Sequence, residues 1–213
     1  MNTDEHIIEH ADIAAQETVA REEKNTGTLF VVTGPSGAGK DSVIARATEL
    51  GLEFGSVTTT TSRAMRPGES EGHPYHFVTQ DEFERKVDNK EMIEWATVYG
   101  NYYGSTKQEV ERALQEHSVV IMKVDIQGAR TLKEMMPHAV VVFIQPPSVE
   151  YLRKRLEARA TDAPEIIEQR LAVAESEMQN LDQWDTVIKN LEDALDDAAQ
   201  QLIHTIETAT SKK

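Results

Sequence analysis

The chain has 213 residues, of which 39% are hydrophobic and 28% are charged, a composition typical of a globular protein. It has no cysteine, which excludes disulfide bonds and cysteine-based metal sites. The formal net charge of −15 argues against general binding to nucleic acids or to anionic membranes. We see neither an apolar run of about 20 residues, the length of a membrane span, nor a secretory signal. A cytoplasmic protein is therefore expected.

Four short apolar segments predict the core strands. Residues 1–26 are polar and acidic, and we expect a surface extension there. Beyond Gly27, β-branched runs without polar alternation predict strands that are buried on both faces, as in a parallel sheet. These runs are residues 28–32, 119–125, 139–145 and 186–190. Helical patterns separate them, notably at residues 105–117, 162–181 and 191–206. Strands that alternate with helices predict an α/β fold, a parallel sheet flanked by helices.

Residues 57–105 break this alternation. They are rich in threonine, tyrosine, glycine and turn-forming residues. Such a composition favours short strands joined by tight turns. We therefore predict a small inserted lobe that is mostly antiparallel.

The segment "GPSGAGK" lies between the first predicted strand and a helical segment, "DSVIARATEL". That context makes the glycine-rich pattern informative as a phosphate-binding loop (P-loop), although a tight turn with an incidental lysine is the alternative. The glycines let backbone N–H groups surround phosphate oxygens, and Lys40 adds a mobile positive charge. The predicted phosphate contacts are Gly34, Pro35, Ser36, Gly37, Ala38, Gly39, Lys40, Asp41 and Ser42.

Asp41 is unexpected, because a serine or threonine that holds magnesium usually follows the loop lysine. A carboxylate beside a polyphosphate repels it unless a cation lies between them. Asp41 either ligates Mg²⁺, which prefers hard oxygen ligands, or stabilises the start of the helix. The sequence leaves both roles open.

A second anion site is indicated by Arg63 and Arg66, which are followed by Tyr75. Two guanidinium groups and a phenol suit a terminal phosphate, although surface ion pairs would also explain the arginines. Further along, Glu94 precedes Tyr103 and Ser105. A lone carboxylate that accepts hydrogen bonds from guanine N1–H and the exocyclic amine would select guanine over adenine.

From Gly27 onward the chain resembles guanylate kinase. The resemblance covers nearly all of residues 27–190 and depends on "GPSGAGK", "TSRAMRPGESEGHPYHFV", "IEWATVYGNYYGS", "VDIQGA", "FIQPPSVEYLRKRLEAR" and "VIKN". It implies transfer of the γ-phosphate of ATP to GMP, and to dGMP, with Mg²⁺ as cofactor. It also implies a P-loop core at residues 27–56, 106–150 and 174–213, a GMP-binding lobe at 57–105 and a helical lid at 151–173.

The resemblance also assigns site residues. Arg63, Arg66, Tyr75 and Tyr103 would hold the GMP phosphate, and Thr59, Glu94 and Ser105 would bind the guanine. Asp125 would lie near GMP and metal, and Asn190 near the adenine of ATP. Together with Lys40, the lid arginines Arg155, Arg159 and Arg170 would neutralise the phosphates during transfer.

Two positions depart from the family's usual pattern. Asp41 replaces a hydroxyl residue, and Lys123 stands where guanylate kinases commonly carry an acid, two residues before Asp125. We therefore expect Asp41 and Lys123 to lie close together and to compensate each other. Two other functions are compatible with parts of the pattern: a related kinase that phosphorylates ribose 1,5-bisphosphate, and a non-catalytic guanylate-kinase-like interaction domain.

Overall fold

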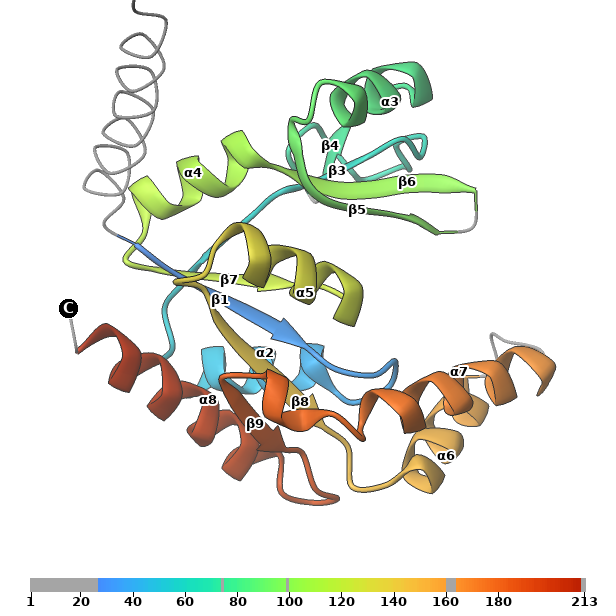
Figure 1. Ribbon diagram of the computed structural model, residues 1–213, viewed down its shortest axis with the longest axis vertical. Coiled ribbons are helices and arrows are strands. Elements are labelled where there is room, and N and C mark those ends of the chain that lie inside the picture. The colour runs from blue at the N-terminus through green and yellow to red at the C-terminus, as the bar shows by residue number, and fades with distance from the viewer. Residues whose placement is uncertain (1–26, 74, 99, 160–163, 212–213) are drawn as a thin grey trace, which may run out of the picture.

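The computed structural model describes residues 27–73, 75–98, 100–159 and 164–211, without the side chains of Val98 and Arg159 (Figure 1). The predicted N-terminal extension, residues 1–26, lies outside the described residues.

A five-stranded parallel sheet forms the centre of the protein, in the order β2–β7–β1–β8–β9. Its strands are β1 (Thr28–Thr33), β2 (Gly55–Ser56), β7 (Val119–Lys123), β8 (Val140–Gln145) and β9 (Thr186–Lys189). All four strands predicted from the apolar runs are confirmed. The short β2 adds an edge strand that the sequence pattern did not reveal.

Both faces of this sheet are buried, as the lack of alternation predicted. In β1, Leu29 and Val31 pack on one side with α4 (Lys107–Glu116) and α5 (Ile126–Met135). Phe30 and Val32 pack on the other side with α2 (Lys40–Glu49) and α8 (Leu195–Thr210). Figure 1 shows these helices on the two sides of the sheet. The arrangement places the loop after β1 at the carboxyl end of the sheet, where parallel α/β folds bind ligands.

The last helix begins later than predicted. The pattern indicated a helix from Leu191, but α8 begins at Leu195. Asp193 has φ 59°, a left-handed conformation that an α-helix does not contain. Leu191 is 50% exposed, so its apparent place in the apolar stripe is not used for packing.

The inserted lobe contains a separate four-stranded sheet in the order β4–β3–β6–β5. Its elements are β3 (Thr59–Thr61), β4 (Tyr75–Phe77), α3 (Gln80–Asp88), β5 (Met92–Val98) and β6 (Asn101–Thr106). The β3–β6 and β5–β6 pairs are antiparallel and the β3–β4 pair is parallel, which confirms a mostly antiparallel lobe. Helix α3 was not predicted; it places Phe83 in stacking contact with Tyr102, at 5.1 Å between ring centroids.

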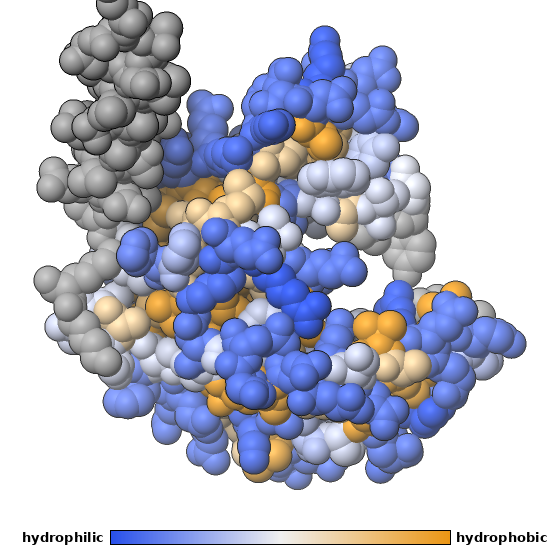
Figure 2. All heavy atoms as spheres, in the orientation of Figure 1, coloured by the Kyte–Doolittle hydropathy of each residue, from blue (hydrophilic) through white to orange (hydrophobic). Residues whose placement is uncertain are grey.

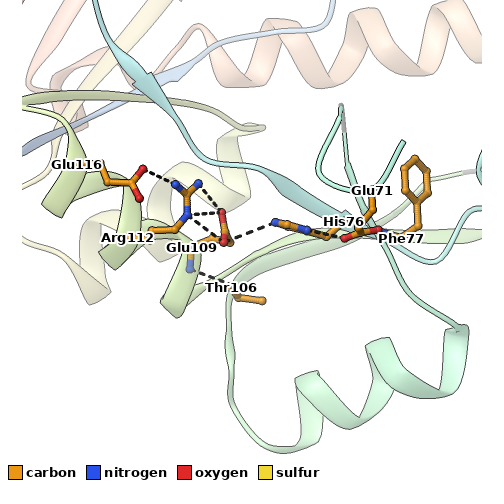
Figure 3. Close-up of polar contacts among 7 residues, drawn as sticks. All are labelled: Glu71, His76, Phe77, Thr106, Glu109, Arg112 and Glu116. Carbon is orange, nitrogen blue, oxygen red and sulfur yellow. Dashed lines mark hydrogen bonds and ion pairs between the residues drawn. The ribbon is translucent and has the colours of Figure 1, made fainter. Parts of the chain in front are cut away.

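A chain of polar contacts links the lobe to α4 (Figure 3). On β4, His76 Nδ1 lies 2.7 Å from Glu71, and its Nε2 lies 3.6 Å from Glu109 on α4. Arg112 contacts Glu109 at 2.9 Å and also pairs with Glu116. Because Glu71 belongs to the lobe and α4 packs on the central sheet, the contact between His76 and Glu109 is the one in this chain of contacts that joins the lobe to the core.

Helices α6 (Val149–Arg159) and α7 (Pro164–Glu177) lie where the lid is predicted, and the lid role stays a prediction. They share a small apolar cluster that includes Leu152 and Leu171. Arg153 on α6 pairs with Glu168 on α7 and joins the two helices. Helix α7 continues to Glu177, beyond the predicted lid boundary at residue 173. A 3₁₀ turn (Leu181–Gln183) then leads to β9. Within the part of the chain described here, no helix has the length and apolar character needed to cross a membrane.

Candidate active site

The loop between β1 and α2 holds the side chain of Lys40. The Lys40 ammonium donates hydrogen bonds to the carbonyl oxygens of Gly34, at 2.5 Å, and Pro35, at 3.1 Å. Gly37 and Gly39 have φ angles of 87° and 93°, which glycine adopts without the strain that a side chain would add. The lysine is therefore positioned over the loop that is predicted to bind phosphate.

The Lys40 ammonium lies among several charges. Burial lowers its pKa from 10.5 to about 8, and repulsion from Lys123 contributes in the same direction. Attraction to Asp41, Glu177 and Asp125 opposes this change. At neutral pH, which lies below this value, Lys40 is mostly protonated and available to an anionic ligand.

Asn190 supports the P-loop from the end of β9. Its side-chain amide donates to the carbonyl oxygen of Ala38 at 2.8 Å, and the residue is only 4% exposed. A Cβ atom at Gly39 would collide with this amide and would approach Arg155. The contact between Asn190 and adenine stays a prediction, whereas the contact with the loop is direct.

A cavity of about 620 Å³ opens beside the loop. Its lining combines residues of the loop, the end of β7 and helix α7: Gly34, Ser36, Lys40, Lys123, Val124, Asp125, Ile126, Ile166, Gln169, Arg170, Val173 and Glu177. Figure 2 shows an open space between the lobe and the end of the molecule that carries α6 and α7. The cavity is thus lined from the P-loop, from the end of β7 and from α7.

Two of the three predicted lid arginines can be placed. Arg155 approaches the P-loop, since its Nη1 would lie 3.1 Å from a Cβ at Gly39. Arg170 lines the cavity that contains Lys40. The side chain of Arg159 lies outside the described residues.

The predicted phosphate residues of the lobe surround the guanidinium of Arg63. Arg63 pairs with Glu69 at 2.8 Å and lies 5.5 Å from the centre of the Tyr75 ring. It also has hydrogen-bonding contact with Tyr103, whose ring meets that of Tyr75 edge to face at 5.7 Å. Arg66 is exposed and donates its backbone N–H to Glu69 at 2.7 Å. Arg63, Tyr75 and Tyr103 thus form one cluster, with Arg66 at its solvent side.

The predicted guanine residues lie on neighbouring strands. Glu94 on β5 is paired in register with Ser105 on β6. Burial raises the pKa of Glu94, and hydrogen bonding with Ser105 partly offsets this. Thr59 and Ser105 line a second cavity, of about 340 Å³. The negative charge of Asp125 also contributes to the raised pKa of Glu94.

Comparison with known proteins identifies the family. A family model described as guanylate kinase matches residues 26–209. The chain is 42% identical over 173 residues to a guanylate kinase of Dechloromonas aromatica, and the match covers 80% of this chain and 86% of that protein. It is 43% identical over 173 residues to a guanylate kinase of Carboxydothermus hydrogenoformans, with coverage of 80% and 85%. The chain belongs to the guanylate kinase family. The crystal structure of guanylate kinase from Anaplasma phagocytophilum agrees, with a TM-score of 0.62, 31% identity and coverage of 86% of each chain.

As a guanylate kinase family member, the chain carries an ion pair at the two positions that depart from the family's usual pattern. The ammonium of Lys123, at the end of β7, hydrogen-bonds to the carboxylate of Asp41 in the first turn of α2. The predicted proximity of the two side chains is confirmed, and their compensation of each other stays a prediction. Lys123 also lines both cavities, the one next to Lys40 and the one next to Thr59.

Sequence reasoning missed two acidic residues of this guanylate kinase site. Glu69 holds the guanidinium of Arg63, and Glu177 lines the Lys40 cavity with a carboxyl pKa that burial raises. The sequence held a cue for Glu177, because it lies seven residues, about two helical turns, after Arg170 on α7. For Glu69, the cue was an acid close in sequence to two predicted phosphate-binding arginines.

The Mg²⁺ expected from the sequence stays a prediction, and the described part of the site offers two carboxylates as oxygen donors for it. Among residues 27–73, 75–98, 100–159 and 164–211, no group of three or more histidine, aspartate or glutamate side chains is arranged to hold a metal ion. Asp41 nevertheless offers an exposed carboxylate directly after Lys40, a hard oxygen ligand of the kind Mg²⁺ prefers. Asp125 accepts the backbone N–H of Gly128 through Oδ1 at 2.7 Å, and its second carboxylate oxygen makes it another oxygen donor near Lys40.

Proposed function

We propose that this protein transfers the γ-phosphate of ATP to GMP, and to dGMP, giving ADP and the corresponding nucleoside diphosphate. One observation carries the proposal: the cavity that contains Lys40 and the cavity that contains Thr59 and Ser105 share Lys123 in their linings. A phosphate-binding loop and a predicted guanine site that adjoin in this way can place two nucleotides end to end.

The lobe binds and orients the acceptor. Arg63, supported by Glu69, donates to the GMP phosphate together with Tyr75 and Tyr103. Arg66 adds a second guanidinium from the solvent side. Glu94 accepts hydrogen bonds from the guanine N1–H and exocyclic amine, and Thr59 and Ser105 complete the base site. No side-chain nucleophile is needed, because the GMP phosphate oxygen itself attacks the γ-phosphorus.

The P-loop and lid bind the donor. The backbone of residues 34–39, Lys40 and the side chain of Ser42 surround the ATP phosphates, and Asn190 keeps the loop in shape through its bond to Ala38. Arg155, Arg159 and Arg170 neutralise charge that develops during in-line transfer. Closure of α6 and α7 over the open cleft excludes water, which would otherwise hydrolyse ATP.

Mg²⁺ is the proposed cofactor, and Asp41 and Asp125 are the residues that would hold it. The ion supplies positive charge that neutralises the phosphate oxygens. We place the reaction in purine nucleotide metabolism of the cytoplasm. The net charge of −15 argues against nucleic acids and membranes as partners, and the local gathering of Lys40, Lys123 and Arg170 suits small anionic nucleotides.

A coupled ATP-consumption assay tests the proposal with GMP, dGMP, AMP and ribose 1,5-bisphosphate as acceptors. We expect turnover with GMP and dGMP, and rates for AMP lower by at least about a hundredfold, since adenine lacks the donor pair that Glu94 accepts. Activity confined to ribose 1,5-bisphosphate, or absent with every acceptor, would overturn the proposal.

A further inference from the structure

Lys123 lies where two cavities meet. It is the last residue of β7 and pairs in register with Val32, close to the carboxyl end of β1. The cavity of about 620 Å³ contains Lys40, and the cavity of about 340 Å³ contains Thr59 and Ser105. Of the described residues, Lys123 is the one that these two linings share. A charge at this junction faces the donor site and the acceptor site together.

The proposed function gives this junction a chemical meaning, and the inference rests on it. In-line transfer requires the γ-phosphate of ATP to lie between the donor loop and the acceptor phosphate. A cation at the junction therefore lies beside the group that is transferred. Lys40 is the other ammonium at this place, and Lys123 is near enough to lower its pKa.

The pairing with Asp41 explains how Lys123 is held without nucleotide. An unpaired carboxylate directly after Lys40 would repel an incoming polyphosphate. The two side chains are 46% and 79% exposed, and ion pairs as exposed as this one contribute little to stability. The flexible lysine stem can therefore exchange its carboxylate partner for a phosphate at low cost.

We propose that Lys123 binds the γ-phosphate of ATP, and that Asp41 holds its ammonium in place until the nucleotide arrives. Binding opens the Asp41–Lys123 ion pair. The ammonium then neutralises a γ-phosphate oxygen, and the carboxylate becomes available to solvent or to a cation. No covalent bond forms or breaks in this exchange, and no proton moves.

The test measures the affinity for ATP and ADP by calorimetry in the presence of EDTA, so that no metal contributes. ADP lacks the γ-phosphate. We expect Lys123→Met to weaken ATP binding about tenfold or more, the effect of losing a charge-assisted hydrogen bond, and ADP binding less than about threefold. Lys123→Arg should retain most of the ATP affinity. The matched control is Lys86→Met, which removes the same charge from an exposed pair with Glu91 on the distant helix α3 and should change neither affinity.

A second pair of variants separates phosphate binding from simple compensation of charge. The Asp41→Asn variant should bind ATP more tightly than the wild type, because ATP binding then no longer has to open an ion pair between Lys123 and a carboxylate. Adding Lys123→Met to the Asp41→Asn variant should again lower the affinity for ATP about tenfold. If it costs nothing in that background, Lys123 serves only to neutralise Asp41, and the proposal is wrong.

Equal losses for ATP and ADP would also overturn the proposal, because they would place Lys123 away from the γ-phosphate. Thermal melting of each variant confirms that it is folded. None of these measurements needs an acceptor. The expected ATP pattern in a protein that fails to phosphorylate GMP would therefore reject the proposed acceptor while supporting the role of Lys123.

Discussion

Replacing Glu94 by glutamine tests the guanine site most directly. The carboxylate of Glu94 would accept two hydrogen bonds from guanine, and a glutamine amide presents an NH₂ donor where an acceptor is needed. A hydrogen bond to a charged group contributes about 1.5–3 kcal/mol, so two amount to about 3–6 kcal/mol. We therefore expect kcat/KM for GMP to fall by about 10²- to 10⁴-fold, with little change for AMP. Ser105→Ala is the matched variant on the facing strand and should cost about tenfold or less.

The same substitution should not destabilise the fold. Burial raises the pKa of Glu94, so over the pH range between its ordinary and raised pKa the native state binds more protons than the unfolded chain. The stability contributed by this group is present below that range and is lost as pH rises through it. Above that range the charged carboxylate carries a burial cost that glutamine does not have, so the melting temperature of Glu94→Gln, measured there, should equal or exceed that of the wild type.

Steady-state kinetics with GMP and AMP, together with thermal melting, decide the matter. An unchanged ratio of GMP to AMP activity would refute the role of Glu94 in selecting guanine. A fall in melting temperature that parallels the loss of activity would show that Glu94 acts through the fold instead.

Three further predictions concern the phosphate sites. Because the pKa of Lys40 is about 8, the affinity for metal-free ATP should fall as pH rises above that value, and ATP binding near that pH should take up a proton. Calorimetry in two buffers of different ionisation enthalpy measures both the affinity and the proton uptake. An ATP affinity that stays constant to high pH would contradict the reasoning. Asn190→Ala leaves the buried carbonyl of Ala38 without its partner and should lower the free energy of unfolding in urea by about 1–3 kcal/mol, whereas a loss within the error of the measurement would show that the bond adds nothing. Glu69→Gln should raise KM for GMP several-fold with kcat little changed, because Arg63 loses its charged partner; an unchanged KM would mean that Arg63 is held by its aromatic neighbours alone.

Much of the fold followed from local patterns. Strands buried on both faces need apolar residues in succession, and β1 shows why, since Leu29 and Phe30 enter opposite cores. The predicted start of the last helix was wrong. The helical spacing of apolar residues begins at Leu191, but Asp193 has a left-handed backbone conformation that a hydrophobicity pattern does not reveal. The parallel pairing of β3 with β4 could not be predicted either, because three-residue strands have no sequence pattern that distinguishes parallel from antiparallel pairing.

The site divides in the same way. The sequence by itself determined the P-loop, the family and even the pairing of Asp41 with Lys123, 82 residues apart, because two unusual charges at related positions suggested each other. Only the tertiary structure brought Glu177 to the cavity of Lys40 and placed the Asn190 amide on the carbonyl of Ala38, 152 residues away. Residue patterns report the backbone and burial of an element, which depend on neighbours a few positions apart. Which side chains meet across the cleft depends on how the sheet, lobe and lid helices pack, and no single segment carries that information.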